Sequence, residues 1–467
     1  MTSRRPPNGL FRDLLAETGW TGEELARAVN RLGAESGLTL RYQRASVSQW
    51  AAGIRPRPPA PELLAEAFSR RLGRRITVAD VLPEATAPAA DPVDTETGTP
   101  VEEPTPARQL VDLGRRVAQR DRAAAALVYE HDPRPSPDAR HPHHRHPAAA
   151  PSLPAPRPSP QAAPQAAPQR LTPAATAAVA AMIDVFSTAD RTHGGGFARA
   201  ALAAYLSQSV APLLRAPGPS PLRRQLLRSG ATLSYLCAFM HFDDELHGPA
   251  QRYYRTSLEL AEAAGDPTAQ ALALRALSIQ AHTLKHHRRA LDLAEEAHRR
   301  VTARTPAQVR AGILGQLAVA EAATGRGPAS TRRLDEAARE LENADRNEPA
   351  VGAYHSASLA HQHATVAAHL GDGARAVSAL QASLDRRPGT EPRSRVITCA
   401  ALAELHFARG HLEAACATWH TFLDGYPAVS SARADTALTT MRSLTRVHRR
   451  QPTAQALIQR AALLQRR

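Results

Sequence analysis

The chain has 467 residues, more than one hydrophobic core normally supports, so at least two domains are expected. Aromatic residues make up only 4% of it while alanine is abundant, which favours closely packed helices and argues against a β-rich fold. The formal net charge of +14 indicates a polyanionic partner, although Lys285 is the only lysine and part of the arginine excess can reflect genomic base composition.

Three widely spaced cysteines, Cys237, Cys399 and Cys416, form no C-x-x-C pair. We therefore expect reduced, buried thiols, and neither a disulfide framework nor a zinc site. Two prolines follow Arg4 and Arg5 where a signal peptide would carry its apolar segment, and no run approaches the roughly 18 apolar residues of a membrane helix. These features predict a soluble, cytoplasmic protein without a membrane partner.

The first two expected helices carry ordinary start and stop signals. The first covers Leu10 to Thr18. Thr21 opens the second, because Glu24 stands three residues later at the capping-box position. This second helix extends to Glu35, and Gly37 ends it.

The next stretch predicts a short helix followed by a basic, proline-rich tail. Ser46 and Gln49 have the spacing of a capping box, which places the start of the helix at Ser46. Val47 and Trp50 lie three residues apart and are expected in the core, while Gly53 can end the helix in the left-handed conformation. Gln49 keeps two interpretations, because its side chain can close the capping box or pair with adenine.

Two further helical segments complete the N-terminal domain. Pro61 opens a helix over Glu62 to Leu72, and Thr77 caps a last short turn that ends near Leu82. Residues 1–80 contain thirteen arginines and eight acidic residues, a net charge of +5 that is compatible with a nucleic-acid partner.

The stretch Arg41 to Pro59 resembles the recognition helix of Xre-type, phage-repressor-like helix-turn-helix domains. It is similar to actinobacterial transcriptional regulators that join such a domain to a tetratricopeptide-like array. The residues that carry the resemblance are Arg41, Tyr42, Ser46, Val47, Ser48, Trp50, Gly53, Pro56, Arg57, Pro58 and Pro59.

The resemblance assigns roles to seven polar side chains. It implies that four of them face bases in the major groove of double-stranded DNA, namely Arg44, Ser46, Ser48 and Gln49. It implies that three others contact phosphate, namely Arg41, Arg55 and Arg57. The chain departs from the family between the two central helices, because Asn30 to Ala45 intervenes where a helix-turn-helix has only a few residues.

Residues 83–170 change composition to proline, alanine and acidic residues, and then to histidine and arginine. Such a segment can bury little apolar surface, so we expect a linker that is disordered except for a helix over 107–129. Four of its histidines are closely spaced, but prolines interrupt them and no cysteine or acidic residue lies among them. A solvated tract is therefore expected rather than a metal site at His141, His143, His144 and His146.

Helical sequence resumes near Leu171, with helices expected over Ala174–Ala189 and Phe197–Leu214. The three glycines from Gly194 to Gly196 predict a turn between them. These glycines lack the preceding strand and the Gly-Lys-Ser/Thr of a phosphate-binding loop. A similar A-D-x-x-x-G-G-G segment begins the C-terminal domain in the actinobacterial family, which also implies a turn.

Self-similarity marks the rest of the chain. Each unit contains the end of one helix, a polar or glycine turn, and a second helix with a small residue, and the first turn is expected at Gly248 and Pro249. The aligned small residues are Ala250, Ala290, Ser330, Ala376 and Ala415. Their intervals of 39 to 46 residues exceed the period of about 34 in an ideal tetratricopeptide repeat. We expect five helix pairs, and residues 432–467 as a sixth or capping pair, stacked into a solenoid with a concave groove.

Other polar clusters are expected to have no catalytic role. His282 and His286 lack the glutamate of a zinc-protease helix, and Asp243 to Glu245 should form a solvated turn. Four histidines predicted on one helix are candidates for pH-responsive groove residues, namely His355, His361, His363 and His369. No catalytic or complete nucleotide-binding motif appears, so we expect neither an enzyme nor a bound cofactor.

The sequence predicts an all-α protein with a helix-turn-helix domain over 1–82, a linker over 83–170 and a tetratricopeptide-like array over 171–467. The expected function is that of a nucleoid-associated transcriptional regulator. Its array would bind a peptide or protein effector in the groove, form a homodimer, or do both. The alternative is a protein-interaction adaptor without sequence-specific DNA binding, which has no use for an exposed polar face around Arg44, Ser48 and Gln49.

Overall fold

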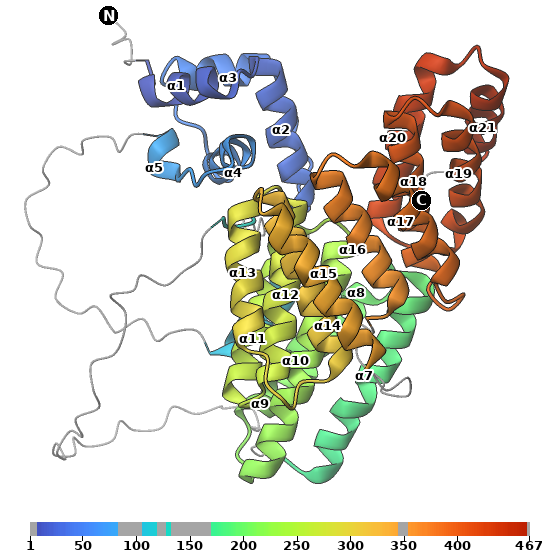
Figure 1. The fold of residues 1–467 in the computed structure, drawn as a ribbon. Helices are drawn as coiled ribbons and strands as arrows, with labels where there is room; N and C mark the ends of the chain where they lie inside the picture. The colour runs from blue at the N-terminus through green and yellow to red at the C-terminus, as the bar shows by residue number, and fades with distance from the viewer. Residues whose placement is uncertain (1–6, 83–104, 119–127, 132–169, 344–353, 465–467) are drawn as a thin grey trace, which may run out of the picture.

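A computed structural model describes residues 7–82, 105–118, 128–131, 170–343 and 354–464. Helices are the only regular secondary structure within these ranges, so the predicted all-α fold is confirmed. Figure 1 shows a small N-terminal group of helices next to a stack of paired helices. The predicted histidine tract at 141–146 lies outside the described residues.

The N-terminal domain contains five helices around its own core. Their bounds are α1 Gly9–Thr18, α2 Gly22–Glu35, α3 Arg44–Ala51, α4 Ala60–Leu72 and α5 Val78–Val81. Thr21 and Glu24 form the predicted capping box at the start of α2. Phe11, Leu25 and Phe68 are completely buried, and they pack with side chains from all five helices. This core holds α3 in a fixed orientation.

Part of the predicted linker packs against the repeat array. Helix α6, Pro106–Ala118, covers the first half of the helix predicted over 107–129, and residues 119–127 lie outside the described ranges. Leu110 is fully buried in the main core of the array. Gly114 allows this close packing, because a Cβ atom there would lie 2.3 Å from Cβ of Ser207.

The repeat array begins with a long helix, α7 Pro173–His193, and a second run composed of α8 Gly195–Tyr205, a π-helical turn Leu206–Val210 and α9 Ala211–Arg215. Only Gly194 separates α7 from α8, so the predicted three-glycine turn is shorter than expected. Gly194 has a φ of +88°, and a Cβ atom there would lie 2.4 Å from the Ser430 carbonyl oxygen.

Six antiparallel helix pairs follow, as predicted. Their bounds are α10 Ser220–Asp243 with α11 His247–Ala263, α12 Pro267–Thr283 with α13 His287–Arg299, α14 Ala307–Ala323 with α15 Gly327–Glu342, α16 Ser356–His369 with α17 Gly373–Arg386, α18 Pro392–Ala408 with α19 Leu412–Gly425, and α20 Ala432–Thr445 with α21 Pro452–Ala462. Two 3₁₀ turns, Tyr426–Ala428 and Arg446–His448, lie in the last two pairs.

The repeat alignment identifies the positions where paired helices touch. All five aligned small residues have 0% exposure: Ala250, Ala290, Ser330, Ala376 and Ala415. A larger side chain at such a position would keep the two helices of its pair apart. The three cysteines are also free and buried, as expected of packing residues.

The predicted break at Gly248 and Pro249 is wrong. Helix α10 ends at Asp243 and α11 begins at His247, so both residues lie in the first turn of α11. A helix tolerates proline in its first turn because the first backbone N–H groups have no partner within the helix. The true turn is carried by Glu245, which has a φ of +56°.

The acidic run Asp243 to Glu245 is not the solvated turn that was predicted. Asp243 is fully buried, and its carboxylate accepts the Gly195 N–H at 3.1 Å. The Arg393 and Arg433 guanidinium groups each lie 3.9 Å from the same carboxylate. These contacts connect α8, α10, α18 and α20, so the acidic run joins the first and last parts of the array.

Two buried histidines should make the array sensitive to acid. Burial lowers the pKa of both His241 and His247 to about 3. The unfolded chain takes up a proton near pH 6.5 and the folded chain does not, so the free energy of unfolding falls as the pH drops below 6.5. Each histidine can remove up to about 1.4 kcal/mol of the free energy of unfolding per pH unit in this window.

We expect the Tm measured by circular dichroism to fall between pH 6.5 and 4.5, and to fall less in a His241→Gln/His247→Gln variant. Equal pH dependence of the two proteins would contradict this prediction.

Candidate nucleic-acid interface

Helix α3 is held at both ends by side chains from other helices. The Asn30 side chain accepts the Tyr42 N–H at 2.8 Å and donates to the Tyr42 carbonyl at 2.9 Å, which fixes the chain just before α3. At the other end the Arg12 guanidinium donates to the Ala51 carbonyl at 3.0 Å. Because α1 and α2 supply these contacts, α3 has a defined position despite its eight residues.

The inner face of α3 packs into the N-terminal core as predicted. Val47 is 2% exposed and Trp50 is 5% exposed. The Trp50 ring meets the edges of Tyr42 and Phe11, with ring centroids 5.0 and 6.5 Å apart. Gly53 ends this segment with a φ of +96°, the left-handed conformation that the sequence predicted.

The predicted capping box of Ser46 and Gln49 is wrong. The helix starts two residues earlier, with Gln43 as its N-cap residue. The Ser46 hydroxyl accepts the Gln43 N–H at 3.4 Å, so Ser46 lies inside the first turn and is half-buried. The capping interpretation of Gln49 therefore fails.

The outer face of α3 is polar and exposed. Arg44, Ser48 and Gln49 are all exposed. The Ser48 hydroxyl donates to the Arg44 carbonyl at 3.0 Å, within the helix, which leaves its oxygen free to accept a hydrogen bond. Figure 1 shows α3 on the side of the N-terminal domain that faces away from the repeat array. The predicted base-facing side chains are thus brought together on one accessible surface, with Ser46 at its edge.

The three predicted phosphate-contacting residues surround this face. Arg41, Arg55 and Arg57 are exposed, and within the described residues none of them forms an ion pair. By contrast, Arg70 and Arg74 elsewhere in the domain pair with glutamates. The positive charge beside α3 is therefore not neutralised by carboxylates of the described chain.

The opposite side of the N-terminal domain contacts the array through a buried ionic group that the sequence analysis missed. Glu66 on α4 is 4% exposed, and its carboxylate lies 2.9 Å from His286 Nε2 and 2.6 Å from Arg70 Nε. Burial alone would raise the pKa of Glu66, but the His286 hydrogen bond and the Arg70 charge together lower it. No local pattern could link residues 220 positions apart.

Residues 128–131 bridge the same two parts of the protein. Val128 packs against the N-terminal core, and the Tyr129 ring stacks on the His286 ring at 5.3 Å with an interplanar angle of 8°. The Glu130 N–H donates to Gln251 Oε1 at 2.9 Å, and the Gln251 amide donates back to the Glu130 carbonyl at 2.8 Å. The N-terminal domain is therefore fixed to the array by α4 and this bridge, which leaves α3 free.

Comparison with known protein families gives a match over the N-terminal domain. The family model described as the SP15 N-terminal domain matches residues 11–81. That range covers most of α1 and ends at the last residue of α5, so it coincides with the five helices that share the N-terminal core. No curated protein shows a significant match to the chain.

Two other features were sought among the described residues, a metal centre and a membrane span. They contain no group of three or more histidine, cysteine, aspartate or glutamate side chains arranged to hold a metal ion. Within the same ranges, every helix is too short or too polar to cross a bilayer. The exposed polar face and its arginines are suited to binding a polyanion by hydrogen bonds and charge.

Proposed function

We propose that this protein is a DNA-binding transcriptional regulator whose helix α3 enters the major groove of duplex DNA. The observation that carries the proposal is the exposed polar face of α3, bordered by unpaired arginines and anchored by a buried tryptophan. A major groove about 12 Å wide admits such a helix. The proposal includes membership of the Xre-type regulators with a tetratricopeptide-like array, acting in the cytoplasm at the nucleoid.

Side chains on the outer face of α3 would read bases. The Gln49 amide can donate to and accept from one adenine, and the Arg44 guanidinium can donate two hydrogen bonds to one guanine. Ser48 can accept a hydrogen bond through its free lone pair. Ser46, which is half-buried, would contribute at the edge of the same face.

The arginines around α3 would supply most of the affinity. Arg41, Arg55 and Arg57 can each neutralise a phosphate and release a bound counterion. Such contacts position the helix but carry no sequence information. The repeat array would then receive an effector or pair with a second copy, and its rigid contact with α4 would transmit that event to the N-terminal domain.

A protein-interaction adaptor is the second candidate function. The fixed contact of the N-terminal domain with the array favours it, because Glu66 and His286 make one continuous body of the two parts. An adaptor would recruit partners through the array and would need no cationic surface beside α3. DNA binding that depends on this surface therefore separates the two functions.

Electrophoretic retardation with pooled genomic fragments tests the regulator. Relative to the wild type, an Arg55→Ala/Arg57→Ala variant should bind at least about tenfold more weakly at physiological salt. The plot of log affinity against log salt concentration should become less steep by about 1.8, because each lost phosphate contact reduces the steepness by about 0.9.

The matched control is Arg449→Ala/Arg450→Ala, which removes two exposed arginines from the array. It changes the net charge equally and should leave DNA binding unchanged. If both double variants lose affinity to the same extent, net charge rather than the α3 surface governs binding. Absence of any retarded fragment at low salt would reject the regulator and favour the adaptor.

A further inference from the structure

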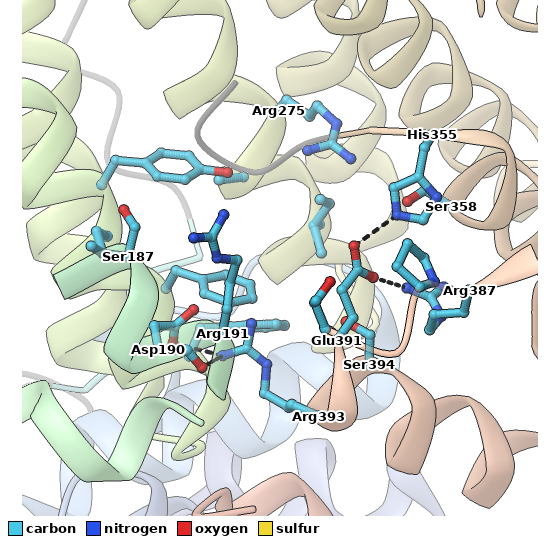
Figure 2. Close-up of a pocket in the computed structure, with 18 of the residues that line it drawn as sticks. Ser187, Asp190, Arg191, Arg275, His355, Ser358, Arg387, Glu391, Arg393 and Ser394 are labelled. Atoms are coloured by element: carbon cyan, nitrogen blue, oxygen red, sulfur yellow. Dashed lines mark hydrogen bonds and ion pairs between the residues drawn. The ribbon is translucent and has the colours of Figure 1, made fainter. Parts of the chain in front are cut away.

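The repeat array contains a cavity of about 600 Å³. On one side it is lined by α7, α10 and α12, and on the other by α16 and the loop before α18 (Figure 2). All of these elements come more than 100 residues after α3 in the chain. Its volume falls in the range of about 300 to 1,000 Å³ that is usual for sites of small molecules. A small molecule or one side chain fits such a volume.

One wall of the cavity is aromatic. It is formed by Tyr235, Phe239, Phe242 and Tyr254, of which Phe242 and Tyr254 are almost completely buried. The α10/α11 pair supplies all four rings, so they are held by the packing of the main core. Tyr235 and Phe239 are half-buried, so a flat apolar group could pack against these two rings and lose its contact with water, while Phe242 and Tyr254 support them from behind.

Two of the four arginines that line the cavity are neutralised by carboxylates. The Arg393 guanidinium lies 2.6 Å from Asp190, and the Arg387 guanidinium lies 2.7 Å from Glu391. His355 Nε2 lies 2.8 Å from the same Glu391 carboxylate. Figure 2 shows these contacts as dashed lines on two sides of the cavity.

The other two arginines have no carboxylate partner among the described residues. Arg275 is held in place because its Nε donates to the Gly312 carbonyl at 2.8 Å and its guanidinium lies 5.7 Å from the Tyr354 ring centre. Arg191 donates one hydrogen bond, to Thr188 Oγ1 at 3.3 Å, and is exposed at the end of α7. Figure 2 shows both guanidinium groups facing the same space. Their positive charges are therefore available to a ligand in the cavity.

We propose that this cavity binds a small amphipathic organic anion. Its carboxylate, sulfonate or phosphate would accept hydrogen bonds from Arg191 and Arg275, and its flat apolar part would lie on the aromatic wall. Arginine binds such anionic groups with two parallel hydrogen bonds, and a neutral ligand would leave both charges uncompensated. The claim that this ligand is the effector of a regulator rests on the proposed function. The claim that the cavity binds it does not.

A pair of fluorescent probes that differ in charge tests the proposal on the full-length protein. The anionic probe is 8-anilinonaphthalene-1-sulfonate, and the uncharged probe of nearly the same shape is N-phenyl-1-naphthylamine. Titration calorimetry gives the stoichiometry, and fluorescence gives the affinity. We expect one equivalent of the anionic probe to bind. Arg191→Gln and Arg275→Gln should each weaken this binding at least tenfold and leave the affinity for the uncharged probe unchanged.

Two further variants complete the design. Arg224→Gln removes an exposed arginine from the same helix as Tyr235, about 16 Å away along α10, and should have no effect. Ser358→Trp fills the cavity and should abolish binding of both probes. Arg191 is exposed, so its substitution tests the proposal even if the Arg275 variant does not fold.

The proposal is overturned if the anionic probe binds the arginine variants as tightly as the wild type, if both probes weaken equally, or if Ser358→Trp binds as before. No DNA is present in these titrations. Failure of DNA binding would therefore leave an established anion site intact, and failure of anion binding would leave a DNA-binding protein intact.

Discussion

Replacing Trp50 by alanine should unfold the N-terminal domain while the repeat array stays helical. The indole is 5% exposed and packs on Tyr42 and Phe11, so the substitution removes a central part of the core. Such truncations cost about 3 to 5 kcal/mol, a large share of the 5 to 15 kcal/mol that normally stabilises a domain. Helix α3 would not persist alone, because a helix of eight residues is unstable in water without tertiary contacts.

Hydrogen exchange on the full-length protein measures this effect. Amides of residues 9–81 should lose protection in Trp50→Ala, amides of α12 to α19 should keep it, and DNA binding should disappear. Trp50→Phe keeps an aromatic ring and serves as the matched control, with a much smaller loss of protection. Unchanged protection in the alanine variant would show that Trp50 does not support the domain.

Replacing Glu66 by alanine should release the N-terminal domain from the array. The substitution removes the only carboxylate within 3 Å of His286 in the described structure and leaves the buried Nε2 of His286 without its partner, whereas Nδ1 keeps its contact with His131 at 2.6 Å. Loss of one member of a buried ionic group costs about 3 kcal/mol. Arg70 keeps its contact with Glu35 at 2.7 Å, so α4 itself should remain folded.

Small-angle X-ray scattering gives the size of the whole molecule and tests the release. The radius of gyration should increase in Glu66→Ala, and amides at the start of α13 should exchange faster. Glu62→Ala is the matched control, because Glu62 is exposed one turn earlier on the same helix. Equal radii for the two variants and the wild type would mean that the bridge at 128–131 holds the domain without Glu66.

Features set by neighbouring residues could be predicted from the sequence. The Thr21 and Glu24 capping box, the left-handed Gly53 and the inward Trp50 each depend on a few adjacent positions. The repeat alignment succeeded for a related reason. The helices of each pair can approach closely only at a small side chain, so the packing requirement repeats along the chain and leaves a visible pattern.

Features set by distant residues could not be predicted. The start of α3 depends on the side chain of Asn30, which fixes Tyr42 before the helix and moves the first turn ahead of Ser46. Asp243 is buried only because Gly195 and Arg393 reach it from other helices. The same limit applies to the contact of Glu66 with His286 and to the cavity in the array, whose lining residues span more than 200 positions.

The most direct test of whether α3 reads bases is a selection experiment. The full-length protein selects duplexes from a random pool, and the bound fraction is then sequenced. The wild type should recover a common motif. Gln49→Ala should relax the preference at one position of that motif, whereas Arg55→Ala should reduce recovery of all sequences alike. Base recognition by this helix would be contradicted if the wild type recovered no common motif. It would also be contradicted if Gln49→Ala and Arg44→Ala recovered the same motif as the wild type.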